Sequence, residues 1–107
     1  MRFEALELAL VIITLLRKLL PAIARHDPKL HRQLRDAGSS IPMNLAEGNR
    51  RRGKDRNFLW SVASGSADEV FTGLRTAQAW GYVPEGTCNE ALEHLDRLQA
   101  MLWKLMH

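Results

Sequence analysis

Apolar side chains recur three or four positions apart through four successive segments of this 107-residue chain. That spacing places them on one face of an α-helix. Ala, Leu, Arg and Glu are plentiful while aromatic and β-branched residues are scarce, a balance that favours helix over strand. Short turns between the segments predict antiparallel neighbours in up-down order. The sequence therefore predicts an all-α, antiparallel four-helix bundle that forms a single domain over residues 1–107.

The first segment, about residues 2–20, is apolar nearly all round. Its predicted core stripe is Leu6, Ala9, Leu10, Ile13, Leu16 and Leu20, while Leu8, Val11, Ile12, Leu15 and Leu19 fall on other faces. In an isolated bundle each helix buries about one stripe, so the excess predicts a second interface through self-association. Pro21 is expected to end or kink this helix.

The second segment opens with Asp27 as N-cap and Pro28 at the first helical position. Its predicted core residues are Leu30, Leu34, Ala37, Ile41 and Leu45. Pro42 lies inside the pattern and predicts a kink. Gly48 is expected to close the helix in a left-handed cap.

The third segment, about residues 54–80, ends at Gly81, and the fourth begins near Pro84 or Glu85, or later if Thr87 and Glu90 form a capping box. The predicted stripe of the third is Leu59, Val62, Ala63, Ser66, Val70, Leu74 and Ala77, with Trp60, Ala67 and Phe71 on a flanking stripe. That of the fourth is Cys88, Ala91, Leu92, Leu95, Leu98, Leu102 and Met106, with Trp103 beside it.

Small residues at positions 63–67 and 37–40 interrupt the third and second segments. A glycine such as Gly65 inside a helix costs about 1 kcal/mol relative to alanine. Close approach between the two stretches is the expected compensation.

The sequence offers few groups for catalysis. Histidine and cysteine spacings match no metal motif, and no phosphate-binding loop or nucleophile elbow is present. We therefore expect a non-enzymatic protein without a cofactor or metal. A nuclease that binds metal through Glu47 and Glu69 is the catalytic alternative. Against it stands a polar network in which Asn44 and Glu47 pair with Ser66 and Glu69 or with nearby arginines.

The single cysteine, Cys88, excludes an internal disulfide and favours a reducing cytoplasm. The apolar run at residues 8–16 is too short to span a membrane. We expect it to form a buried helix of the mature fold.

The clearest surface feature is a basic cluster between the second and third segments. Five cations occupy seven positions, and the formal net charge of the chain is +3. Such a cluster is typical of phosphate contacts in RNA or DNA, although no aromatic residue is interleaved to stack on bases. A solvated turn is the alternative. The candidate nucleic-acid-binding residues are Arg50, Arg51, Arg52, Lys54 and Arg56.

Two stretches carry a resemblance to a known family. The run from Ser40 to Gly48, SIPMNLAEG, and the run from Ala63 to Glu69, ASGSADE, resemble the four helix bundle family of intervening-sequence proteins. Those proteins are encoded inside insertions in bacterial large-subunit ribosomal RNA genes. The same superfamily includes the accessory variability determinant of diversity-generating retroelements. The motif positions matched here are Asn44, Glu47, Gly48, Gly65, Ser66 and Glu69, for which a structural role is at least as well supported as a functional one.

The resemblance implies a barrel-like homopentamer and supplies no catalytic residue. Its retroelement branch implies binding of RNA or DNA and of a reverse transcriptase. Our first hypothesis is an oligomeric nucleic-acid-binding protein of this type. The alternative is a structural or protein-interaction module with no nucleic-acid role.

Overall fold

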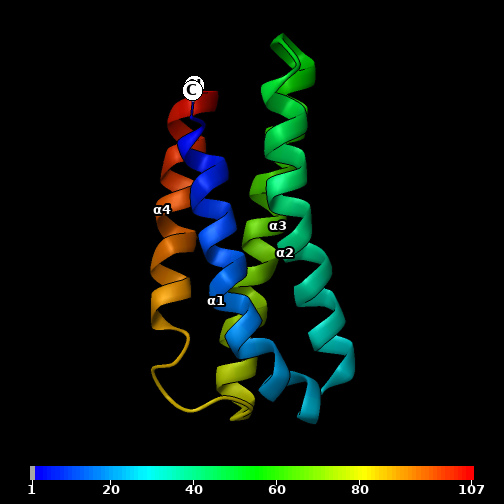
Figure 1. Cartoon of the computed structure of the whole chain (residues 1–107), viewed down its shortest axis with the longest axis vertical. Helices are drawn as coiled ribbons and strands as arrows, with labels where there is room; N and C mark the ends of the chain where they lie inside the picture. Colours follow the sequence, from blue (N-terminus) through cyan, green and yellow to red (C-terminus); the bar gives the residue numbers. More distant parts are fainter. Residues whose placement is uncertain (1) are drawn as a thin grey trace.

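The computed structural model describes residues 2–107, and these residues form four α-helices and no strand. The helices are α1 (Glu4–His26), α2 (Pro28–Asn49), α3 (Gly53–Trp80) and α4 (Asn89–Met106). Each packs against the next, and α4 returns to pack against α1. The result is the predicted antiparallel bundle, with extents of 42 × 22 × 21 Å (Figure 1).

Helix α1 differs from the prediction in its length and in its buried face. It continues through Pro21 to His26, because Ile23 is fully buried and packing holds the turn after the proline in place. The predicted stripe is confirmed only at Ala9 and Leu16, since Leu10 is 45% exposed and the other three predicted residues are half-buried. A helix that is apolar nearly all round has no single face that its periodicity identifies. The residues that enter the core are Ala5, Leu8, Ala9, Ile12, Leu16 and Ile23.

Helix α2 begins as predicted. The Leu30 amide donates to Asp27 Oδ1 at 3.0 Å, which confirms Asp27 as the N-cap. The Tyr82 hydroxyl donates to Asp27 Oδ2 at 3.3 Å, and this bond ties the α1–α2 corner to the segment after α3. Partial burial, together with the negative charge of Asp27, raises the pKa of Tyr82. All five predicted core residues of α2 are buried.

Helix α3 ends at Gly81, as predicted, with a φ of 78° that suits glycine. Its core face is rotated from the main predicted stripe. Trp60 and Ala67, from the flanking stripe, are buried, whereas Leu59 and Ser66 are half-buried and Val62 is exposed. The flanking stripe therefore supplies part of the face that the bundle covers.

Helix α4 begins at Asn89, so the start predicted near Pro84 or Glu85 is wrong. The predicted capping box is also wrong. The Thr87 hydroxyl donates to the Pro84 carbonyl at 2.7 Å, within the turn, and the N-cap residue Cys88 makes no capping bond. The α4 core is confirmed at Cys88, Ala91, Leu95, Leu98 and Leu102.

Glycines allow close approach, but not at the predicted place. Gly65 is exposed, with open space where a Cβ would stand. Leu34 of α2 instead packs onto Gly73 of α3, and Leu16 of α1 packs onto Gly38, 2.9 Å from an added Cβ. The two small-residue stretches do meet at Ser66 and Ser40, whose hydroxyl oxygens lie 2.8 Å apart.

None of the four helices is long and apolar enough to cross a membrane.

Candidate nucleic-acid interface

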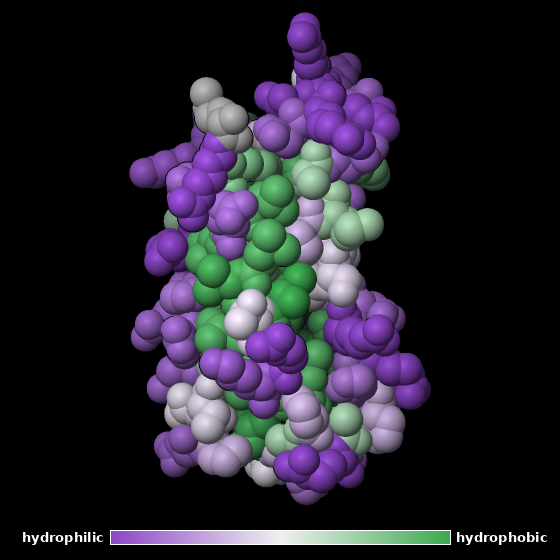
Figure 2. All heavy atoms as spheres, viewed as in Figure 1, coloured by the Kyte–Doolittle hydropathy of each residue, from purple (hydrophilic) through white to green (hydrophobic). Residues whose placement is uncertain are grey.

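Residues Arg50, Arg51 and Arg52 join α2 to α3 at one end of the long axis of the bundle (Figure 1). The Arg51 amide donates to the Gly48 carbonyl at 3.0 Å, so the chain leaves α2 through a tight turn. It enters α3 at Gly53, whose φ is 59°. This end of the molecule is strongly hydrophilic in Figure 2. The turn and the start of α3 thus place the basic cluster at this end of the bundle.

The predicted left-handed cap at Gly48 is wrong. Gly48 is buried inside α2, which runs one residue further to Asn49. The glycine is needed for space: an added Cβ would lie 2.6 Å from Trp60 Cδ1 and 2.7 Å from Trp60 Nε1. Trp60 Nε1 donates to the Leu45 carbonyl at 3.3 Å. The absence of a side chain at Gly48 therefore leaves room for Trp60, whose indole packs and hydrogen-bonds α3 to the end of α2.

Two of the five predicted cations have internal partners. Arg56 donates to the Gly48 carbonyl at 3.2 Å and to the Asn49 carbonyl at 3.0 Å, and its guanidinium lies 5.2 Å from the centre of the Trp60 ring. Arg51 pairs with Glu47 at 2.6 Å. These two arginines bind carbonyls and a carboxylate at the end of α2, a structural role that the charge pattern alone did not show.

The other three cations face solvent. Arg50, Arg52 and Lys54 are exposed, and within residues 2–107 their side chains make no hydrogen bond or ion pair. We call these three residues the tip cations. Since no internal partner holds them, they are the members of the cluster best placed to meet an external anion.

The residues matched to the family motif fall into three places. Asn44 Nδ2 donates to the Ser40 hydroxyl and carbonyl, both at 2.9 Å, and Ser66 donates to the same hydroxyl. Glu47 instead bonds Arg51, and Glu69 lies exposed at the edge of a depression between α2 and α3. The expected network therefore forms around Ser40, without joining Glu47 to Glu69.

A second polar cluster was missed in the sequence. Gln99 of α4 accepts from the Ser64 hydroxyl at 2.7 Å and donates to the Ser64 carbonyl at 2.8 Å and to Asp68 at 2.9 Å. A lone glutamine on a polar face gives no sequence signal of such a bond. The cluster fixes α4 against α3 at mid-height.

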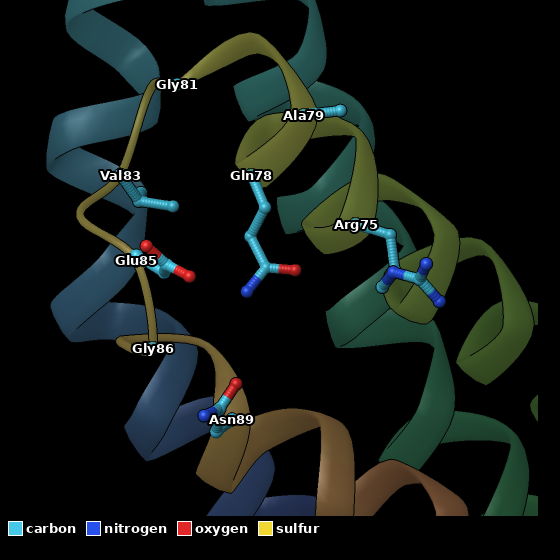
Figure 3. A pocket seen from close by; sticks show the side chains of 8 residues that line it. All are labelled: Arg75, Gln78, Ala79, Gly81, Val83, Glu85, Gly86 and Asn89. Carbon is cyan, nitrogen blue, oxygen red and sulfur yellow. The ribbon is translucent and has the colours of Figure 1, made fainter.

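The far end of the bundle holds a depression of about 620 Å³ between α3 and the segment that leads to α4. Figure 3 shows the Gln78 side chain directed into it, with Arg75 beside it on α3 and Asn89 at the start of α4. In residues 2–107, no three potential metal-ligating side chains gather at this or any other place.

A family model described as 23S rRNA-intervening sequence protein matches residues 2–104. The chain belongs to this family. A solved structure of similar fold is that of a protein of unknown function from the S23 ribosomal protein family of Bacteroides thetaiotaomicron. It superposes with a TM-score of 0.78 at 17% identity, covering 95% of this chain and 94% of that one. At this identity the likeness shows the fold alone. No match was found among curated proteins.

Two of the residues matched to the family motif, Glu47 and Gly48, lie at the end of α2, close to the start of α3. Gly48 seats Trp60, and Glu47 holds Arg51. Both contacts shape the turn that carries the tip cations. Glu47 and Gly48 thus help to position the candidate interface, whereas Asn44, Gly65, Ser66 and Glu69 lie away from it.

Proposed function

We propose that this intervening-sequence protein is a non-enzymatic, oligomeric binding protein that contacts RNA or DNA through the tip cations. The observation that carries the proposal is that Arg50, Arg52 and Lys54, at the turn and the start of α3, are exposed and have no partner among the described residues 2–107. Phosphate contacts by Arg and Lys supply most non-specific affinity for nucleic acids. Arginine adds a fork of donors that matches phosphate oxygens.

The local charge balance favours an anionic partner. Five cations in residues 50–56 stand against the carboxylates of Glu47 and Asp55, and Arg51 already neutralises Glu47. At physiological salt the Debye length is about 8 Å, so these neighbouring charges act together on a ligand at the turn.

Self-association is supported by the apolar surface that the bundle leaves uncovered. Figure 2 shows a hydrophobic band over α1 and toward α2. A groove of about 360 Å³ between α1 and α2 is lined by Ile13, Leu16 and Leu20, with the polar side chains of Arg17, His31 and Arg35 at its edge. A contiguous apolar surface of this kind is typical of a protein interface. A ring such as the homopentamer implied by the family resemblance would display the tip cations on every subunit.

The test is a salt titration of RNA binding. We expect the triple variant Arg50→Ala, Arg52→Ala, Lys54→Ala to bind a structured RNA more weakly. The slope of log affinity against log salt should become shallower by about 0.7–0.9 for each lost phosphate contact. The matched control replaces Arg25, Lys29 and Arg32, three exposed cations at the other end of the bundle, with alanine. Equal affinity and slope in the triple variant and the parent would rule out the turn as the binding site.

The alternative function is a protein-interaction or structural module without nucleic-acid binding. The exposed apolar band favours it, because the band can be covered by a protein as well as by another copy. In that case binding to RNA should vanish at physiological salt in the parent protein. A reverse transcriptase of a diversity-generating retroelement is the partner that the family resemblance implies for the first, nucleic-acid-binding function, and co-purification with such an enzyme would support that function over the alternative.

A further inference from the structure

An aromatic ring lies exposed beside the tip cations. Phe58 is 67% exposed on α3. It follows Lys54 by four residues, and residues four apart are neighbours on a helix surface. Phe58 is outside the basic run in the sequence, so the pitch of the helix is what brings the ring to the cations.

The Phe58 ring lines a shallow depression to which the basic turn contributes Arg51. The depression has a volume of about 200 Å³ and is lined by Glu47, Arg51, Asp55, Phe58 and Leu59. This is smaller than the ~300–1,000 Å³ of pockets that enclose a drug-sized ligand. It suits a flat ring laid against Phe58 and Leu59 better than a fully enclosed molecule.

The polar groups stand at the edge of the depression. Arg51 Nη2 and Glu47 Oε1 are 2.6 Å apart, and Asp55 adds a second carboxylate. A nucleobase has the complementary form, because its faces are apolar and its edges carry hydrogen-bond donors and acceptors. The tip cations lie on the adjoining turn, where the phosphates of the same strand would pass.

We propose that Phe58 stacks on an unpaired nucleobase, so that the turn binds single-stranded nucleic acid in preference to a duplex. This proposal rests on the proposed function, since the tip cations hold the backbone while Phe58 holds the base. Paired bases are stacked inside a helix and leave no free face for the ring, whereas every unpaired base presents one.

The experiment compares the affinity of Phe58→Ala, Phe58→Trp and the parent for a single-stranded RNA oligonucleotide and for a duplex of equal phosphate count. We expect Phe58→Ala to lose about fivefold or more in affinity for the single strand, the lower end of what one stacked base contributes, and little for the duplex. Phe58→Trp should keep the single-strand affinity. Trp80→Ala is the matched control, because Trp80 is 69% exposed at the other end of α3.

The possible results separate this proposal from the proposed function. If the triple tip-cation variant loses affinity while Phe58→Ala binds the single strand as the parent does, stacking is overturned and phosphate binding stands. If Phe58→Ala changes the molar mass of the particle in light scattering, the ring belongs to a protein interface and stacking is again overturned. If the parent binds neither nucleic acid, both proposals fail.

Discussion

At the scale of the residue, three glycines leave the space in which a larger side chain from another helix packs. Leu16 packs on Gly38, Leu34 on Gly73, and Trp60 on Gly48. The last of these contacts lies at the end of the molecule that carries the basic turn, where Trp60 also lies under the Arg56 guanidinium and its ring centre is 5.6 Å from that of Phe3. A rigid indole has few ways to make room for a new methyl group.

The replacement Gly48→Ala should therefore lower the free energy of unfolding by about 1–3 kcal/mol, the usual range for overpacking. Gly65→Ala is the matched control, since it changes the same residue type where an added Cβ meets open space. It should raise the free energy of unfolding by up to about 1 kcal/mol through helix propensity. Urea denaturation measures both. A stabilised Gly48→Ala would show that Trp60 moves away without cost.

At the scale of the element, Arg56 joins two helices. It belongs to α3 but donates to the Gly48 and Asn49 carbonyls at the end of α2, and the Gly48 carbonyl also accepts from the Arg51 amide. Such carbonyls need a partner at every helix end. The arginine thus holds the turn between the helices in one shape and fixes where the tip cations lie.

We expect Arg56→Ala to lower the free energy of unfolding by about 1–2 kcal/mol through the loss of these bonds and of the contact with Trp60. Arg52→Ala removes an equal charge from an exposed residue and should stay within about 0.5 kcal/mol of the parent. Thermal unfolding followed by circular dichroism makes the comparison. Equal melting temperatures for the two variants would contradict a structural role for Arg56.

The helices differ in how well their bounds and core faces could be predicted from the sequence. Helix α2 was predicted in its start and its core, because Asp27 and Pro28 mark the start and polar residues flank a single apolar stripe. In α1, apolar residues occur on every face, so the sequence did not show which face enters the core. The helix continues beyond Pro21 because Ile23 packs in the core. The start of α4 was missed because the segment after Pro84 makes turns of its own.

The sequence identified which cations belong to the candidate site, but it did not show how their side chains are arranged. Charge density identified the five cations, but a sequence does not show that Arg56 turns back to α2 or that Arg51 meets Glu47. Phe58 lies outside both predicted stripes of the third segment and outside the basic run, so neither pattern marked it as part of the site. Phe58 is 67% exposed because it lies on the side of α3 away from the buried residues Trp60, Ala63 and Ala67.

At the scale of the whole molecule, the uncovered face of α1 argues for a larger assembly. Leu10 and Val11 are each 45% exposed although they belong to an apolar helix. A buried leucine contributes about 1.5–3 kcal/mol relative to an exposed one, so covering this face in several subunits is a substantial gain.

Leu10→Glu should therefore reduce the molar mass measured by light scattering coupled to size exclusion. A carboxylate at an apolar interface must lose its water without gaining a partner. Ala100→Glu adds the same charge to an exposed position of α4 and is the control. A parent protein that elutes as a monomer would contradict the assembly, and an unchanged mass in Leu10→Glu would place the interface elsewhere.

The up-down order of the helices also determines the electrical character of the end that carries the tip cations. The starts of α1 and α3 and the ends of α2 and α4 lie together there (Figure 1). A helix macrodipole is positive at its start and negative at its end, with about half an elementary charge at each, so the four contributions oppose one another in pairs. The scaffold itself then presents almost no net potential along its axis. The field at this end is therefore set by its charged side chains, among which the tip cations have no partner within the described residues 2–107.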